Sequence, residues 1–215
     1  MDTLEAISTR RSIRRFKKNP VSKNVILKLL DAAKEAPSGG NMQPWRFIVV
    51  RHRSAIEEMG RIIRQEMVEL PKFLEGKVDN PKSVSEELAV RYLLTSLFFV
   101  QAPVTIAVCV EETEPPLLTS LVKSGMDKYD AACYLGFTNV KSASAATENL
   151  LLAAHSLGLG ACWMNIPFFA KDKLENFLHV KRPYSLFALI PIGKPDHAPQ
   201  APAKLGIHDI SVFVE

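Results

Sequence analysis

A run of basic residues near the N-terminus is the first segment whose side chains could bind a ligand. Six of the nine residues from Arg10 to Lys18 are basic. Guanidinium groups offer forked donors that match phosphate oxygens, and the hydroxyl of Ser12 adds another donor. In an extended segment Arg10, Ser12 and Arg14 would share one side, with Ile13 on the other. The spacing indicates an anion site, although a solvated basic surface or a nucleic-acid patch would produce the same run.

Residues 36–47 (APSGGNMQPWRF) are dense in residues that form turns and in polar side chains. The two glycines let the backbone approach a ligand closely, and Ser38, Asn41 and Gln43 can form hydrogen bonds with a flat ring that carries several heteroatoms. A plain helix-to-strand turn would explain the glycines but not the concentration of amides. The segment is therefore a second candidate binding element.

Apolar patterns predict the elements that must position these two segments. Short β-branched runs predict strands at 46–50, 104–110 and 186–192. Helical spacing predicts helices at 3–9, 55–70, 84–99 and 143–157, and one that Ser22 caps and that ends near Ala36. Gly158 is a natural stop for the helix at 143–157. The tail at 207–214 alternates loosely and is expected to be a strand.

Length and composition are those of a folded soluble domain. The 215 residues carry a net charge of +4, with 47% hydrophobic and 23% charged residues, and we expect one domain over 1–215. Three scattered cysteines form no C-x-x-C pair and the histidines form no metal motif, so neither a disulfide framework nor a metal is expected. The N-terminus lacks the pattern of a signal peptide, and no apolar stretch makes a clean membrane span, so a cytoplasmic location is expected.

The two candidate segments together resemble the nitroreductase family of flavoproteins. In that family R-R-S-x-R-x-F precedes P-S-x-x-N-x-Q-P-W-x-F, and both patterns are nearly complete here. Residues 147–164 are similar to the family's late helix and flavin-facing strand, and residues 189–195 to its closing strand and turn. The resemblance implies an α+β, three-layer fold, in which helices flank a central, mainly antiparallel sheet. It also implies an intertwined homodimer, with an arm at about 195–215 that crosses to the partner.

The same resemblance assigns roles in binding FMN. Arg10, Ser12 and Lys204 would hold the phosphate, with Arg11 contributing through its backbone or a peripheral contact. Arg14 would lie toward the pyrimidine edge of the flavin. The remaining implied contacts come from two other segments. Pro37, Ser38 and Asn41 would reach the flavin of the other subunit, and Trp163, Met164 and Asn165 would line the ring.

The resemblance implies a hydride transfer from NADH or NADPH, through flavin N5, to a small electron-poor acceptor such as a nitroaromatic compound or a quinone. No side chain is expected to be catalytic, because the flavin carries the chemistry. Reductant and acceptor would bind alternately, in a ping-pong mechanism, without nucleic acid or membrane as partner. Segments 67–87 and 111–127 are expected to cover the flavin.

The chain departs from the family pattern at three places. Asn165-Ile166-Pro167 stands where the family often has a glycine, Ala203-Lys204-Leu205-Gly206 where an R-K-P-L-like element is common, and Ser142 where the late helix often carries an acid. The first of these, together with the two variable segments 67–87 and 111–127, leaves the acceptor open. A specialised dehalogenase, enone reductase or dehydrogenase therefore stays possible, as does a protein that binds FMN without turnover.

Overall fold

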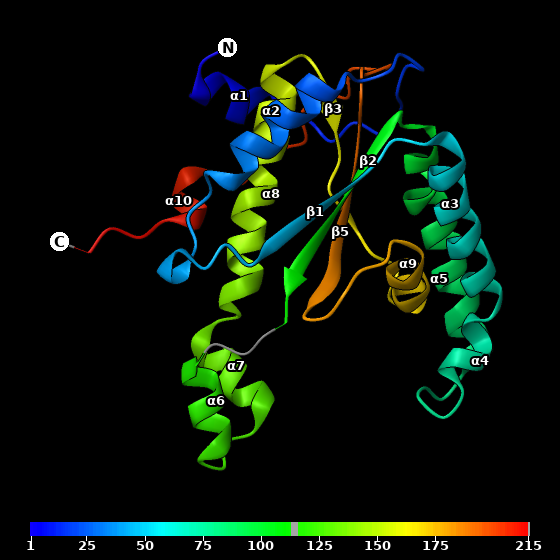
Figure 1. Cartoon of the computed structure of the whole chain (residues 1–215), viewed down its shortest axis with the longest axis vertical. Coiled ribbons are helices and arrows are strands. Elements are labelled where there is room, and N and C mark those ends of the chain that lie inside the picture. The colour runs from blue at the N-terminus through cyan, green and yellow to red at the C-terminus, as the bar shows by residue number, and fades with distance from the viewer. Residues whose placement is uncertain (113–115, 215) are drawn as a thin grey trace.

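The computed structural model describes residues 1–112 and 116–214, and the side chains of all of these except residues 90–96. A sheet crosses the middle of the molecule in the order β1-β2-β5-β3, with β4 also paired to β5 (Figure 1). All of these named strand pairs are antiparallel. The strands are β1 (Trp45–Val50), β2 (Val104–Glu111), β3 (Gly160–Ala161), β4 (Met164–Asn165) and β5 (Tyr184–Gly193). The three longer strands confirm the sequence predictions to within two residues.

Helices cover both faces of this sheet, and β2 is accordingly buried from Val104 to Val110. Val104, Ile106 and Val108 belong to the core beneath α2 (Lys23–Lys34) and α8 (Thr138–Ser156). Ala107 and Cys109 belong to the opposite core. That second core is formed by α3 (Arg53–Val68), α4 (Leu70–Leu74), the described part of α5 (Pro81–Ser96) and α9 (Lys171–Phe177). The predicted three-layer α+β architecture is confirmed.

Local signals explain where the helices on the α8 side begin and end. The Val25 N–H donates to Ser22 Oγ at 3.3 Å and starts α2, which ends at Lys34, just before the predicted boundary. The predicted helix α1 is confirmed at Thr3–Thr9, where Asp2 accepts from the Glu5 N–H. Helix α8 begins five residues earlier than predicted, and Gly158, with φ of 72°, ends it in the left-handed conformation.

The sequence patterns did not predict α6 (Pro116–Lys123), α7 (Lys128–Leu135) or α9. The expected helix at 55–70 is divided at Glu69, because Pro71 cannot continue the hydrogen bonding of α3. The expected helix at 84–99 begins at Pro81 and gives way to a 3-10 turn at Phe98–Gln101. Among the described residues, no helix is both long and apolar enough to cross a membrane.

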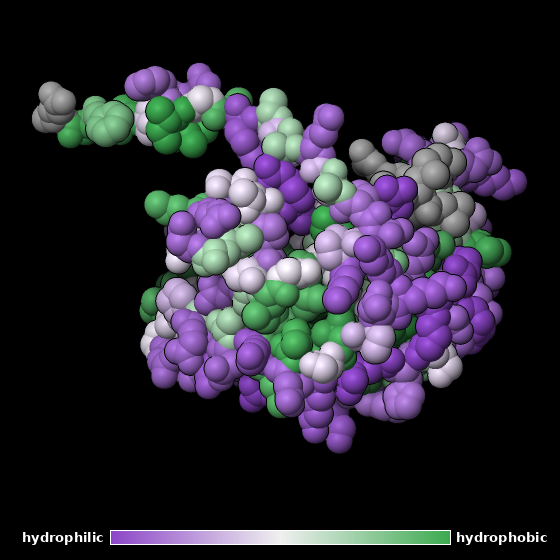
Figure 2. All heavy atoms as spheres, turned by 90° about the horizontal axis from the view of Figure 1, so that it is seen from above, coloured by the Kyte–Doolittle hydropathy of each residue, from purple (hydrophilic) through white to green (hydrophobic). Residues whose placement is uncertain are grey.

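The prediction of a strand at 207–214 is wrong. Ile207–Ile210 form the short helix α10, and the Gly206 N–H donates to Asp209 Oδ2 at 2.9 Å across its first turn. Residues 211–214 have no regular structure, because no strand of the described chain lies alongside them to complete a ladder. Seen from above, this C-terminal arm extends away from the body and carries many hydrophobic residues (Figure 2).

Candidate functional site

A cavity of about 720 Å³ lies between the N-terminal basic segment and the C-terminal arm. Five residues that the sequence predicted as ligands of a phosphate-bearing cofactor line it together: Arg10, Arg11, Ser12, Arg14 and Lys204. The other lining residues are Ile7, Ser8 and the arm residues Pro199, Gln200, Ala201 and Pro202. These four arm residues were not predicted to line the site. The sequence signal at this position is a proline-rich run after the last strand.

The basic segment is fixed by its attachment to strand β3. The Ile13 N–H donates to the Ala161 carbonyl at 3.0 Å, and Ser12 forms a parallel bridge with Ala161. Ile13 is buried and packs against Gly160, where a Cβ atom would lie only 2.6 Å from Ile13 Cγ1. Glycine at 160 therefore lets the segment approach the strand, while Ser12 and Arg14 remain available to the cavity.

The arginines of the cavity are held by defined partners. Arg11 Nη1 donates to the carbonyls of Ser8 at 2.9 Å and Arg10 at 2.7 Å. Arg10 Nε lies 3.3 Å from Glu148 Oε1, but the geometry is not that of a hydrogen bond, so this buried N–H has no acceptor among the described residues. Together with Arg14 and Lys204 these side chains provide four cations beside one carboxylate. Such a donor set fits a phosphate monoester.

His155, near the end of α8, contacts the end of α1. Its Nε2 lies 2.8 Å from Thr9 Oγ1, and that hydroxyl donates to the Glu5 carbonyl at 2.6 Å. Burial, and then the charges of Arg10 and Arg11, lower the pKa of His155 below its usual value. The histidine thus links the end of α8 to the end of α1 as a neutral hydrogen-bonding group.

The chain from β3 to β4, residues 160–165, lies next to the basic segment and is called the wall below. Trp163 is half-buried and meets the Phe187 ring edge-on, with centroids 5.5 Å apart. Met164 is buried and Asn165 is exposed, and both pair with β5. Because Ser12 bridges Ala161, Trp163 is only two residues from the contact that anchors the cavity. Trp163, Met164 and Asn165 do not themselves line the basic cavity in the described chain.

Cys162 lies within this wall but is not poised to react. The residue is buried, and burial raises the pKa of its thiol despite the opposing influence of Arg14 and of Ser12.

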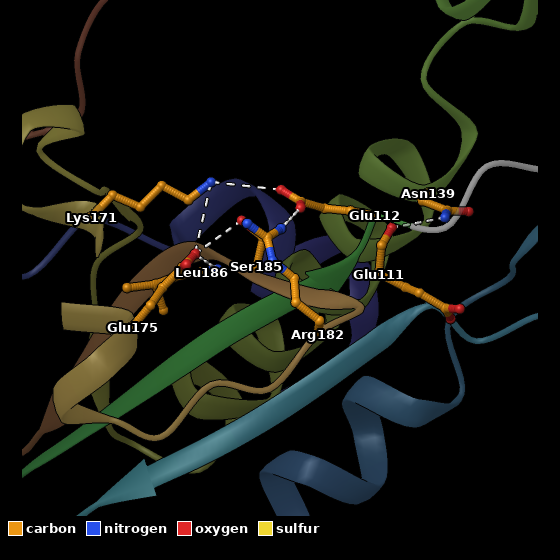
Figure 3. Close-up of polar contacts among 8 residues, drawn as sticks. All are labelled: Glu111, Glu112, Asn139, Lys171, Glu175, Arg182, Ser185 and Leu186. Carbon is orange, nitrogen blue, oxygen red and sulfur yellow. Dashed lines mark hydrogen bonds and ion pairs between the residues drawn. The ribbon is translucent and has the colours of Figure 1, made fainter. Parts of the chain in front are cut away.

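A β-bulge in β5 gives the wall its shape. Val108 pairs with Ala188 and Cys109 pairs with Leu186, so Phe187 is the extra residue of β5. The Leu186 N–H therefore finds an acceptor outside the ladder, in Glu175 Oε1 at 2.7 Å (Figure 3). Phe187, the extra residue, is also the one whose ring contacts Trp163.

Charged side chains surround the bulge at the end of the sheet (Figure 3). The Ser185 hydroxyl donates to Glu175 at 3.0 Å, and Lys171 Nζ lies 3.8 Å from both Glu175 and Glu112. Arg182 forms an ion pair with Glu112. Burial and the Glu175 carboxylate raise the pKa of the Cys109 thiol to about 12. Nothing in the sequence pattern pointed to Glu175.

The second predicted binding segment lies elsewhere on the chain. Gly39 is packed near Thr138, at the start of α8, whereas the cavity meets α8 near Glu148. Ten residues of helix separate these two contacts by about 15 Å. Pro37, Ser38 and Asn41 accordingly contribute nothing to the lining of the basic cavity in the described chain.

The loop around Asn41 is nevertheless held in an uncommon conformation. Gly40, Asn41 and Gln43 have φ values of 58°, 55° and 49°. The Gln43 N–H donates to Ser38 Oγ at 3.0 Å, which closes the loop and leaves Asn41 exposed. Non-glycine residues with such angles concentrate where a loop is shaped for a ligand or a partner.

The predicted covering segments do not line the cavity. Neither residues 67–87 nor the described part of 111–127 contributes to its lining, and residues 113–115 of the second segment lie outside the described residues. Ser142, the departure in the late helix, is buried and donates to the Thr138 carbonyl at 2.9 Å. Its role is therefore within α8.

Comparisons with known proteins agree with this geometry. The family model for the nitroreductase family matches residues 7–194. A protein of Methanothermobacter thermautotrophicus, whose name NADH dehydrogenase/NAD(P)H nitroreductase is provisional, is 33% identical over 205 residues, covering 93% of this chain and 80% of the relative. An iodotyrosine deiodinase of Thermotoga neapolitana is 26% identical, covering 87% of this chain and 85% of the relative.

Solved structures share the whole architecture. The crystal structure of a BluB-like flavoprotein from Clostridium difficile 630 superposes with a TM-score of 0.87 at 29% identity, over 100% of both chains. Motifs, fold and comparisons lead to one assignment. The chain belongs to the nitroreductase family.

Proposed function

We propose that this protein is an FMN-dependent oxidoreductase that uses NADH or NADPH to reduce a small electron-poor acceptor. The observation that carries the proposal is the cavity in which Arg10, Arg11, Ser12, Arg14 and Lys204 meet beside the wall at Trp163. Further support comes from similarity to a BluB-like flavoprotein and to a relative named for NAD(P)H.

In this proposal the basic residues bind the cofactor and the wall orients it. Arg10, Ser12 and Lys204 bind the phosphate, and Arg11 adds its charge from between Ser8 and Arg10. Arg14, whose guanidinium carbon lies 5.9 Å from the centre of the Phe98 ring, would lie at the pyrimidine edge of the flavin. There a cation favours negative charge on the reduced ring.

In this proposal the chain orients the flavin and excludes water from it, and no side chain takes part in the reaction. Trp163, Met164 and Asn165 line the flavin, and bound FMN would supply the hydride-transfer chemistry. A single open face that serves reductant and acceptor in turn predicts ping-pong kinetics.

We further propose that the site is completed by a second copy of the chain. Pro37, Ser38 and Asn41 of one copy would reach the flavin held mainly by the other, which explains a strained, exposed loop remote from its own cavity. The arm at about 195–215 would cross between copies. Val212, Phe213 and Val214 are 79–94% exposed in the single chain, an unfavourable state for apolar side chains.

The outer edge of β1 offers such an arm a place to bind, since β1 is an end strand of the described sheet.

We propose that the whole chain is one domain of this dimer and that the dimer acts in the cytoplasm. The three free cysteines support the cytoplasmic location.

For the acceptor, nitroaromatic compounds and quinones are the first candidates. Reductive dehalogenation of an aromatic ring is the second, and the similarity to the Thermotoga neapolitana deiodinase supports it. Both candidates are planar, electron-poor or halogenated rings that could stack against a flavin.

An anaerobic titration tests the proposal. Purified protein is loaded with FMN, mixed with NADH or NADPH, and then given a nitroaromatic compound, a quinone or an iodotyrosine while the flavin absorbance is recorded. We expect bleaching by one of the reductants and recovery with at least one acceptor. Protein that retains FMN but is not bleached by either reductant would be a passive flavin binder, and the proposed activity would be wrong.

A further inference from the structure

The side chains of β5 change their alternation at the bulge. Leu186 and Leu189 belong to the core on the α9 side of the sheet, whereas Ala188 belongs to the core on the α8 side. Phe187 also packs against the α8-side core, so two consecutive residues share one face. A regular strand would place them on opposite faces. Since the pairing of residues 188–192 with β2 fixes Ala188 on the α8 side, Phe187 reaches that side only through the bulge.

One carboxylate holds the bulge from outside the sheet. Glu175 lies in α9, and its Oε1 accepts from the Leu186 N–H at 2.7 Å and from the Ser185 hydroxyl at 3.0 Å (Figure 3). Leu186 is buried and comes directly before the extra residue, and the Glu175 side chain is only 15% exposed. A buried donor that loses its acceptor is costly, so the carboxylate and the bulge stabilise each other.

The extra residue of the bulge supports the wall. The Phe187 ring meets the Trp163 ring edge-on, with centroids 5.5 Å apart and an interplanar angle of 75°, an attractive arrangement for two aromatic rings. Trp163 packs against the same α8-side core as Phe187. The next two residues, Met164 and Asn165, pair with β5. The wall is thus attached to β5 by a ladder at 164–165 and by the ring contact at Trp163.

We propose that Glu175 is a positioning residue for the wall: by holding the bulge it fixes Phe187, and through Phe187 it sets the orientation of Trp163. This proposal rests on the proposed function, in which Trp163 lines the flavin. Glu175 does not line the basic cavity. Loss of its carboxylate should therefore change the geometry of hydride transfer while the phosphate-binding residues stay in place.

The first measurement observes Trp163 directly. The chain contains two tryptophans, so full-length protein labelled with fluorinated tryptophan gives two fluorine NMR signals, which Trp163→Phe assigns. We expect Glu175→Ala to move the Trp163 signal by more than its linewidth. Glu175→Gln should leave the signal in place, because the amide oxygen can accept both hydrogen bonds. Glu112→Ala is the matched control, since Glu112 is the other carboxylate beside Lys171, and it should also leave the signal in place.

A double variant tests whether Glu175 acts through Phe187. Glu175→Ala and Phe187→Leu should each lower the limiting rate at which NADH or NADPH bleaches bound FMN by about tenfold, because a displaced wall misorients the flavin. Both variants should bind FMN within a factor of about two of the unmodified protein, since the phosphate ligands are unchanged. The double variant should be no slower than the slower single one, because both substitutions remove the same contact.

Three results would overturn the inference. The first is a Trp163 signal that stays in place in Glu175→Ala. The second is a Glu175→Gln variant that behaves like Glu175→Ala, because charge rather than hydrogen bonding would then be responsible. The third is a double variant in which the two rate losses multiply.

Failure of the proposed function would look different. Unmodified protein that binds no FMN, or whose FMN neither reductant bleaches, would contradict that function. The Trp163 signal would still decide whether Glu175 positions the wall.

Discussion

Individual side chains around the cavity have roles that their type alone does not reveal. Arg10 is both a cation of the cavity and the neighbour of Glu148, whereas Arg11 is oriented by two backbone carbonyls. The sequence motif predicted that these arginines belong to one site. It could not predict the partners that orient them, because those partners come from α8 and from the end of α1.

His155 provides a pH test of this arrangement. Because the folded chain lowers its pKa below 6.5, the unfolded chain takes up the proton first as the pH falls, and the folded state loses stability below about pH 6.5. We expect the melting temperature to fall between about pH 7 and pH 5 more steeply in the unmodified protein than in His155→Gln. The measurement is thermal unfolding by circular dichroism, and parallel curves for the two proteins would rule out this role.

Among the elements, the long strands and α2 follow directly from local pattern, and the irregular features do not. A short, apolar, β-branched run defines β2, and Ser22 defines the start of α2. The bulge at Phe187 depends on Glu175, a residue of another element, and so has no local signature. Helix α6 was missed because its segment, within 111–127, was interpreted only as a variable cover for the flavin.

Glu175→Ala tests the anchoring of the bulge. The substitution leaves the Leu186 N–H and the Ser185 hydroxyl without their acceptor, and should lower the free energy of unfolding by about 1–3 kcal/mol. Glu112→Ala is the control, because its ion pairs with Arg182 and Lys171 are solvent-exposed and are worth about 0–1 kcal/mol. Urea unfolding measures both. Equal losses for the two variants would mean that Glu175 does not anchor β5.

In the whole molecule, the two predicted binding segments are separated along α8, and a long apolar arm leaves the body (Figures 1 and 2). The predicted three-layer architecture and the grouping of the basic residues with Lys204 follow from motifs whose order spans the chain. The fold of the tail could not be predicted in the same way, because its apolar residues have no partner within the described chain.

Shortening the chain tests the proposed exchange of arms. A protein ending at Lys204 keeps the predicted phosphate ligands but loses Leu205, Ile207, Ile210 and the apolar residues 212–214, which are exposed here. We expect the full-length protein to sediment as a dimer and the shortened one to dissociate and to retain FMN more weakly. Replacing Val212, Phe213 and Val214 with serine, at constant length, should also favour dissociation of the dimer and weaken the retention of FMN. A full-length protein that sediments as a monomer would contradict the dimer.

The central claim is that the basic cavity binds the phosphate of a flavin. Its most direct test is a calorimetric titration of flavin-free protein with FMN and with riboflavin, which lacks the phosphate. Charge-assisted hydrogen bonds worth about 1.5–3 kcal/mol each predict that FMN binds at least about tenfold more tightly. Lys204→Ala should remove about tenfold of that preference, while Lys194→Ala, an exposed lysine outside the cavity, should leave it unchanged. Equal affinity for FMN and riboflavin, or no binding of either, would contradict the account.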